Sequence, residues 1–232
     1  MSPSVRHIRH IGMLLAISTP VVGCAADDPD PVSAVDATVT VFATGCRNTS
    51  GRGIGTHIEP GAILTSAHTL AGADTITVTD IDGTSTTASL LAFDPEMDLA
   101  LLSTDPSTAP VGLGADPPTT EEAAGLTGTV VVERAGRFVT LPVTVARRVM
   151  ITTEDIHREG ETRRPGYELI ADIEPGDSGA LLIVDGHGIG VVWSRSTRTD
   201  GRAWAIDVIR AGTTIRDHLA NGIPDTIDLD RC

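Results

Sequence analysis

Lysine is absent from this chain of 232 residues, and its 17 basic residues are all arginines. Acidic residues number 31, so the formal net charge is -14. A surface of that sign repels phosphate, which argues against nucleic-acid binding and against membrane attachment through a basic patch. No glycine-rich loop carries the Lys-Ser or Lys-Thr pair that cradles phosphate, and no cluster has metal-ligand spacing. We therefore expect no cofactor and no metal.

Aromatic residues are also scarce, at 3% of the chain, so Val, Ile, Leu and Thr supply most of the apolar surface. This composition favours strands over helices. Six short apolar runs, a proline-rich connection at residues 104–124 and six further runs predict an all-β fold of two six-stranded antiparallel β-barrels. Barrel one covers about 36–104 and barrel two about 125–207. The predicted strands are Thr38–Ala43, Gly53–Ile58, Ala62–Ser66, Thr75–Thr79, Thr86–Phe93, Leu99–Ser103, Thr127–Glu133, Arg137–Ala146, Tyr167–Ala171, Ala180–Val184, Ile189–Ser194 and Arg202–Ile206.

One helix is predicted after the second barrel, at about 207–220. Val208, Ile209, Ile215 and Leu219 have the spacing of one helical face, and a glycine and a proline follow as stop signals. We expect one folded domain over residues 36–222 and a C-terminal tail at 223–232.

The N-terminus has the pattern of an export signal. Arg6 and Arg9 precede the apolar segment 11–22, which is too short to span a bilayer as a stable anchor and is broken by Pro20. Residues 21–24 read VVGC and resemble a bacterial lipobox, in which the cysteine is lipidated. This predicts a lipoprotein signal peptide at 1–23, a lipid on Cys24, a flexible tether at 24–35 and a location at the bacterial cell envelope. The alternative is an ordinary export signal and a secreted protein.

Two cysteines, Cys46 and Cys232, remain after such processing. An exported chain with two cysteines most simply pairs them. On the chain-entropy model, this disulfide would contribute on the order of 4 to 5 kcal/mol, because the loop that it closes is long. The alternative is two free thiols.

The stretch Glu174–Ile183, EPGDSGALLI, places Ser178 in a glycine-flanked turn that leads into an apolar strand. Gly and Asp are common turn formers, so an ordinary hairpin is one interpretation. The other is a nucleophile held beside backbone amides that receive an oxyanion. Two further segments decide between them: His68 follows the predicted strand 62–66, and Asp98 leads into a buried strand where its carboxylate needs a donor such as an imidazole.

These three segments, TSAH, DLALL and PGDSGA, resemble those of the trypsin-like (chymotrypsin-fold) serine proteases, especially the bacterial exported ones. The similarity runs from about Val39 to Leu219. The resemblance implies a serine endopeptidase that forms an acyl-enzyme, with Ser178 as nucleophile, His68 as general base and Asp98 as the residue that orients the imidazole. It also implies that the amides of Gly176 and Ser178 form the oxyanion hole.

Some residues depart from the animal members of this family. Thr69 stands where they usually carry a cysteine, and Ala180 replaces a second glycine. The activation-type N-terminus, an Ile or Val pair followed by Gly, is missing. We therefore hypothesise that clipping does not switch the enzyme on, and that Asp177 finds local donors in place of a new α-amino group.

The resemblance indicates substrate-binding residues less directly. Asp172 lies six residues before Ser178, where trypsin carries the pocket aspartate that pairs with Arg or Lys; it could instead be a satisfied loop carboxylate. Trp193 and Ser194 belong to a segment that resembles the pocket-wall strand, whose backbone pairs with substrate. Trp193 could equally be a plain core aromatic.

Two competing functions follow from the same residues. An α/β-hydrolase would need Gly-x-Ser-x-Gly with a histidine after the serine, and Ala180 and the strand after Ser178 argue against it. A non-catalytic binding or adhesion module on the same fold remains the alternative to the enzyme. We expect a monomer that acts on protein or peptide substrates, contacts no nucleic acid and meets a membrane only through the lipid on Cys24. The other histidines, His57, His157, His187 and His218, are interpreted as structural or solvated.

Overall fold

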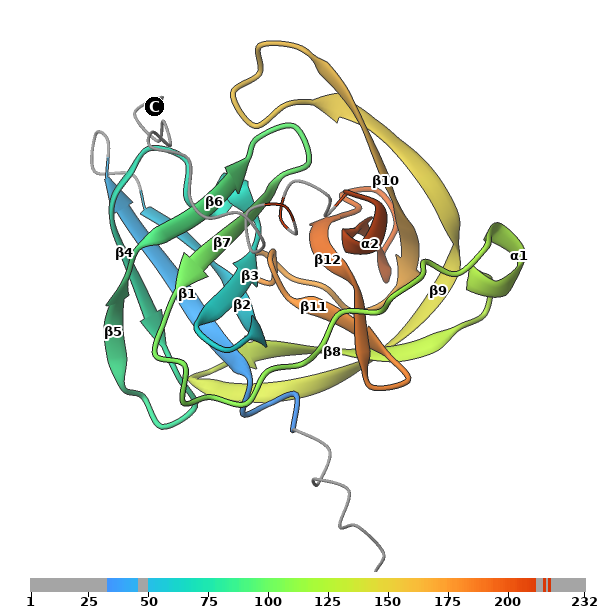
Figure 1. Cartoon of the computed structure of the whole chain (residues 1–232). Helices are drawn as coiled ribbons and strands as arrows, with labels where there is room; N and C mark the ends of the chain where they lie inside the picture. The colour runs from blue at the N-terminus through green and yellow to red at the C-terminus, as the bar shows by residue number, and fades with distance from the viewer. Residues whose placement is uncertain (1–32, 46–49, 212–214, 216, 218–232) are drawn as a thin grey trace, which may run out of the picture. The chain divides into compact units, whose positions relative to one another are not determined.

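Seven strands of the first half pair into one antiparallel sheet in the order β5-β4-β1-β2-β3-β7-β6. The computed structural model describes residues 33–45, 50–211, 215 and 217 (Figure 1). Val39, Val41 and Ala43 alternate toward the interior, as the two-residue period of a strand requires. The strands are β1 (Thr38–Gly45), β2 (Ser50–Glu59), β3 (Ala62–Thr65), β4 (Ala73–Thr79), β5 (Ser85–Ala88), β6 (Leu90–Asp94) and β7 (Leu99–Ser103).

The predicted count of six strands is therefore wrong for this half, because the run 86–93 forms two strands. Ser89 separates β5 from β6: its amide donates to Ser103 Oγ at 3.0 Å, and its carbonyl accepts from the Ser103 amide at 2.7 Å. β5 then pairs with β4, whereas β6 pairs with β7. The residue that breaks the ladder is a single serine with no glycine or proline beside it, so the sequence pattern did not predict the break.

The second half forms the closed six-stranded barrel that was predicted, in the order β10-β13-β12-β11-β8-β9. In Figure 1, β10 and β12 lie on the right of the view, and β8 and β9 run beneath the lower ends of β1 and β5. They are β8 (Thr127–Arg134), β9 (Arg137–Glu154), β10 (Glu161–Ile170), β11 (Leu181–Val184), β12 (His187–Arg195) and β13 (Arg202–Asp207).

β9 and β10 extend well beyond their predicted bounds of 137–146 and 167–171. They pair from Glu161 opposite Glu154 to Ile170 opposite Thr144. The added residues are largely polar, so backbone hydrogen bonds rather than an apolar pattern carry the extension. The longer hairpin brings residues 153–158 to a cavity of the candidate site.

Two short α-helices and one 3-10 helix, η2 (Ala67–Thr69), which carries His68, accompany the strands in the described residues. α1 (Thr120–Ala123) has a capping box, in which Thr119 and Glu122 bond each other's backbone amides. α2 (Val208–Ala211) begins where the C-terminal helix was predicted, and Asp207 Oδ1 accepts the amides of Ile209 and Arg210 at 3.0 and 3.1 Å. Most of the remaining predicted helix lies outside the described residues.

The largest buried apolar cluster contains residues from both halves. Ile54 and Leu64 of the first sheet belong to the same cluster as Leu181 and Val192 of the barrel. Fully burying such side chains contributes roughly 1.5 to 3 kcal/mol each. This shared core fixes β2 and β3 against β11 and β12, and the segments with His68 and Ser178 adjoin these strands.

Several predictions concern residues outside the described part of the chain. They are the signal peptide at 1–23, the lipid on Cys24, the disulfide between Cys46 and Cys232 and the tail at 223–232. Within the residues that are described, no helix is long and apolar enough to span a membrane.

Candidate active site

Asp98 is joined to the histidine segment by three hydrogen bonds. Its Oδ2 lies 2.8 Å from His68 Nδ1, and its Oδ1 accepts the His68 amide at 2.7 Å. Its carbonyl accepts the Ala67 amide at 3.2 Å. The Asp98 side chain is 1% exposed and that of His68 37%. The contact expected from the sequence is thus present, with the buried carboxylate fully engaged and the outer edge of the imidazole open to solvent.

The turn before Asp98 is anchored from the opposite half of the molecule. Arg164 of β10 is 1% exposed, and it donates to the carbonyls of Glu96 and Pro95 at 2.6 and 3.2 Å. Burial lowers the pKa of the Arg164 guanidinium, and the negative charge of Asp98 opposes that shift. Asp98 itself has φ +59°, a conformation uncommon for a residue with a side chain, so the anchored turn has to hold it there. Sequence reasoning missed Arg164.

The turn around Ser178 depends on two glycines with positive φ. Gly176 has φ +99° and Gly179 has φ +93°. A Cβ at Gly179 would lie 2.0 Å from the carbonyl oxygen of Ile54, so no other residue fits there without moving β2. The glycines of the motif are therefore required by backbone angle at both positions and by space at Gly179.

The amides of this turn divide into two groups. Those of Asp177, Gly179 and Ala180 donate to carbonyls at 2.8 to 3.1 Å. The amides of Gly176 and Ser178 donate to no group in the described part of the chain. Two unpaired donors on the same turn form a ready site for a negatively charged oxygen.

Ser178 lies against β2. Its carbonyl accepts the Ile54 amide at 2.8 Å. A Cβ at Gly53 would meet both Ser178 O, at 2.7 Å, and Thr69 Oγ1, at 2.8 Å, which places the serine turn beside the neighbour of His68. The Ser178 hydroxyl donates to Trp193 O at 3.4 Å rather than to the imidazole.

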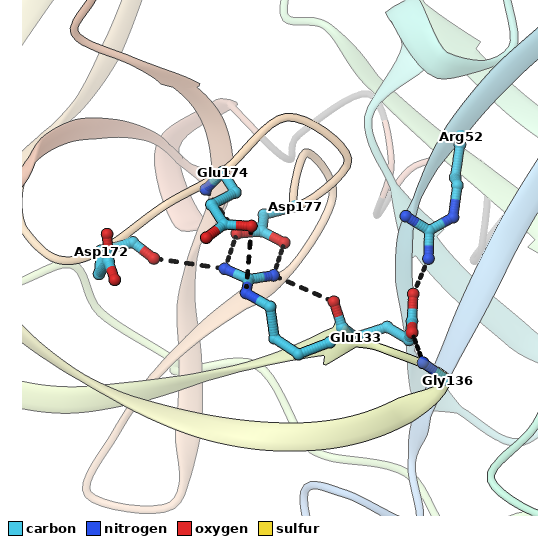
Figure 2. Close-up of polar contacts among 7 residues, drawn as sticks. Arg52, Glu133, Gly136, Asp172, Glu174 and Asp177 are labelled. Carbon is cyan, nitrogen blue, oxygen red and sulfur yellow. Dashed lines mark hydrogen bonds and ion pairs between the residues drawn. The ribbon is translucent and has the colours of Figure 1, made fainter.

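Asp177 is 2% exposed and pairs with Arg134, at the end of β8. Arg134 Nη1 and Nη2 donate to the two carboxylate oxygens at 2.6 and 2.7 Å, and the Glu174 amide donates to Oδ2 at 2.8 Å. Figure 2 shows the side chains of Glu174 and Asp177 and the carbonyl of Asp172 converging on this one guanidinium. The hydrogen bond that Arg134 donates to Asp177 raises the pKa of the Arg134 guanidinium. The hypothesis that Asp177 finds local donors is confirmed, although the sequence did not identify Arg134.

The family model described as trypsin-like peptidase domain matches residues 53–191, a range that contains His68, Asp98 and Ser178. The chain belongs to the trypsin-like peptidase family. It is 30% identical over 185 residues to the serine protease Rv3671c of Mycobacterium tuberculosis, covering 75% of this chain and 46% of that protein. This trypsin-like domain thus spans about half the length of the curated relatives that it matches.

Solved structures of this trypsin-like fold agree with the match. The active form of the M. tuberculosis Rv3671c protease superposes with a TM-score of 0.74 at 26% identity, covering 95% of this chain and 99% of that one. The HtrA-type protease AlgW with a tripeptide gives a TM-score of 0.64 at 26% identity, covering 79% and 60%.

The predicted substrate-binding residues of this trypsin-like domain have different surroundings. Trp193 and Ser194 line a cavity of about 380 Å³ together with His68 and Asp98. Trp193 also stacks on Arg164, with the guanidinium carbon 5.7 Å from the ring centroid, so it is partly structural. Asp172 is exposed, and its carbonyl accepts from Arg134 at 3.3 Å while its carboxylate points away from that arginine in Figure 2.

Proposed function

We propose that this protein is a serine endopeptidase that cleaves peptide bonds through an acyl-enzyme on Ser178. The observation that carries the proposal is the bond between Asp98 and His68 beside a serine turn with two unpaired amides. Membership of the trypsin-like peptidase family supports the same activity.

His68 acts as the general base. An ionised Asp98 can only accept hydrogen bonds, so its contact at 2.8 Å requires the proton of a neutral imidazole to be on Nδ1. Nε2 then keeps its lone pair for the proton of Ser178. In the proposed reaction the serine hydroxyl turns away from Trp193 O, to which its contact is long at 3.4 Å, and donates its proton to the imidazole.

The reaction proceeds in two steps, acylation of Ser178 and hydrolysis of the acyl-enzyme. Ser178 Oγ attacks the peptide carbonyl and forms an ester as the carbon–nitrogen bond breaks, and His68 transfers the serine proton to the leaving amine. Water then attacks the ester, gives a proton to His68 and releases the acid, and the serine recovers its proton. Asp98 stabilises the imidazolium that exists in between.

The amides of Gly176 and Ser178 bind the oxyanion of each tetrahedral intermediate. Both amides lack partners in the described structure, so they are free to donate when the charge develops. One such donor contributes about 3 to 4 kcal/mol of transition-state stabilisation. The backbone of Trp193 and Ser194 pairs with the acyl side of the substrate. Asp172, as the pocket carboxylate, would give a preference for Arg or Lys, and a cleavage profile of Asp172→Ala tests this.

The enzyme is active without proteolytic clipping, because Arg134 already supplies Asp177 with a cation. It is exported by the signal peptide at 1–23, held at the envelope by a lipid on Cys24 and closed by a disulfide between Cys46 and Cys232. Mass spectrometry of the purified protein tests these points. An active form that begins downstream of residue 33 would contradict the unclipped, lipidated enzyme.

Labelling with a fluorophosphonate tests the endopeptidase. The probe phosphonylates an activated serine, so wild type reacts and Ser178→Ala does not. Digestion of a denatured protein mixture then shows whether internal peptide bonds are cut. Folded wild type that neither reacts nor cleaves would favour the non-catalytic binding module.

A further inference from the structure

A second cavity, of about 520 Å³, lies between the first sheet and the hairpin that joins β8 to β9. Its charged lining consists of Arg52, Asp80, Glu133 and Arg137, and Phe138 adds an apolar wall. It shares no lining residue with the cavity at His68 and Trp193. Two arginines in one cavity stand out in a chain whose formal net charge is -14.

Arg52 connects this cavity to the serine turn. Its Nη1 lies 3.1 Å from the position that a Cβ would take at Gly176, the residue proposed for the oxyanion hole. The next two residues of β2, Gly53 and Ile54, contact the carbonyl of Ser178. A substrate segment that extends from the scissile bond past Gly176 therefore comes close to the Arg52 guanidinium.

The open hydrogen-bonding groups of the cavity are mostly donors. Glu133 has both oxygens engaged, one by Arg52 and one by the Gly136 amide, as Figure 2 shows. Asp80 Oδ1 accepts two amides of its own turn, and its Oδ2 is the one carboxylate oxygen of this lining without a partner in the described part of the chain. Arg52 contacts Glu133 through Nη2 only, and the Arg137 side chain has no partner in the described part of the chain.

These observations specify the ligand. A carboxylate supplies acceptors to two guanidinium groups, Arg52 Nη1 and Arg137, whereas an ammonium group finds both Glu133 oxygens occupied and only the Asp80 Oδ2 acceptor open. In the proposed reaction, the cavity at Trp193 and Ser194 binds the acyl side of the substrate. The cavity at Arg52 is therefore assigned to the residues after the scissile bond, which leave with the amine.

We propose that Arg52 and Arg137 are specificity-determining residues that bind a carboxylate on the leaving side of the scissile bond. The proposal rests on the proposed endopeptidase function. Two sources share this chemistry: an Asp or Glu side chain, and the free C-terminus of a substrate cut near its end.

A digest of a peptide library, read by mass spectrometry, distinguishes these sources. One half of the library carries C-terminal amides and the other half free acids. We expect Asp and Glu to be enriched about three- to tenfold within three residues after the cut in both halves if a side chain is bound, as a partly exposed charge pair would give. Binding of the terminus enriches cuts near the end in the free-acid half alone.

Variants connect the preference to these residues. Arg52→Gln should abolish it, and Arg137→Glu should replace it with a preference for Lys or Arg. Arg163→Gln, an exposed arginine outside both cavities, is the matched control and should keep the wild-type profile. The fluorophosphonate carries no leaving peptide, so its labelling rate should be the same in Arg137→Glu as in wild type.

The outcomes separate this proposal from the endopeptidase itself. Cleavage by wild type without acidic enrichment, or with enrichment of Lys and Arg, overturns the carboxylate site and leaves the endopeptidase intact. An acidic preference that survives in both Arg52→Gln and Arg137→Glu also overturns it. Absence of both cleavage and labelling overturns the endopeptidase, and this proposal with it.

Discussion

Arg134 donates to both carboxylate oxygens of Asp177, at 2.6 and 2.7 Å, and so joins the end of β8 to the serine turn. The Asp177 side chain is 2% exposed and that of Arg134 26%. A carboxylate buried to that degree needs a cation and hydrogen-bond donors close by. Here they come from the folded domain itself: the Arg134 guanidinium and the Glu174 amide.

Arg134→Gln should disorder the serine turn, because Asp177 loses its cation while it stays buried. We expect the fluorophosphonate labelling rate to fall at least tenfold and the free energy of unfolding to fall by about 1 to 3 kcal/mol, less than for a fully enclosed pair. Urea denaturation and labelling kinetics measure both. Arg163→Gln, an exposed arginine of β10, is the control. Wild-type labelling by Arg134→Gln would show that the pair does not position the turn.

The two glycines of the turn should differ in their tolerance of alanine. Gly179→Ala creates a contact of 2.0 Å with the Ile54 carbonyl, whereas Gly176→Ala meets only the Arg52 side chain, at 3.1 Å. Both pay the strain of a positive φ, about 1 to 2 kcal/mol. Gly176→Ala should therefore fold with reduced labelling, and Gly179→Ala should lose several times more stability. Equal losses in urea denaturation would contradict the steric argument.

Ser178→Ala, His68→Ala and Asp98→Asn should each lower kcat by a factor of about 10⁴ or more, because proton transfer needs all three groups together. The double variant Ser178→Ala/His68→Ala should be hardly slower than either single variant. Cleavage rates on the best peptide of the library measure this, with circular dichroism as the check of folding. Multiplicative losses would mean that the residues act independently.

His57 of β2 should make the protein less stable in mild acid. It is 3% exposed, its Nδ1 has no hydrogen-bond partner, and burial lowers its pKa from the ordinary value of 6.5. The unfolded chain then binds a proton more readily than the folded one, so stability is complete above about pH 6.5 and is lost as the pH falls below it.

The magnitude is at most about 1.4 kcal/mol per pH unit for one group. Urea denaturation at pH 7.5 and 5.5 should show a smaller loss for His57→Leu than for wild type. His187→Gln, at the exposed first residue of β12, should keep the wild-type loss. The same pH dependence in wild type and His57→Leu would exclude this histidine as the cause.

Local patterns were enough to predict the fold class and to find the three segments that contain His68, Asp98 and Ser178. The alternation of Val39, Val41 and Ala43 and the glycines beside Ser178 reflect backbone constraints that operate within a few residues. The contact between His68 and Asp98 was also expected, since a carboxylate that leads into a buried strand needs a donor. The split at Ser89 and the polar extension of β9 and β10 were not, because pairing partners rather than local composition set them.

The sequence by itself determined which residues can form strands and which turn requires glycine, and it indicated the side chains that we propose as nucleophile, base and orienting acid. Only the tertiary structure decided which arginines lie beside the segments that carry these residues. Arg134 pairs with Asp177, Arg164 binds the turn before Asp98, and Arg52 lies beside Gly176. Charged side chains carry no periodic signal in the sequence, and their partners are set by how β2, β8 and β10 pack around one shared core.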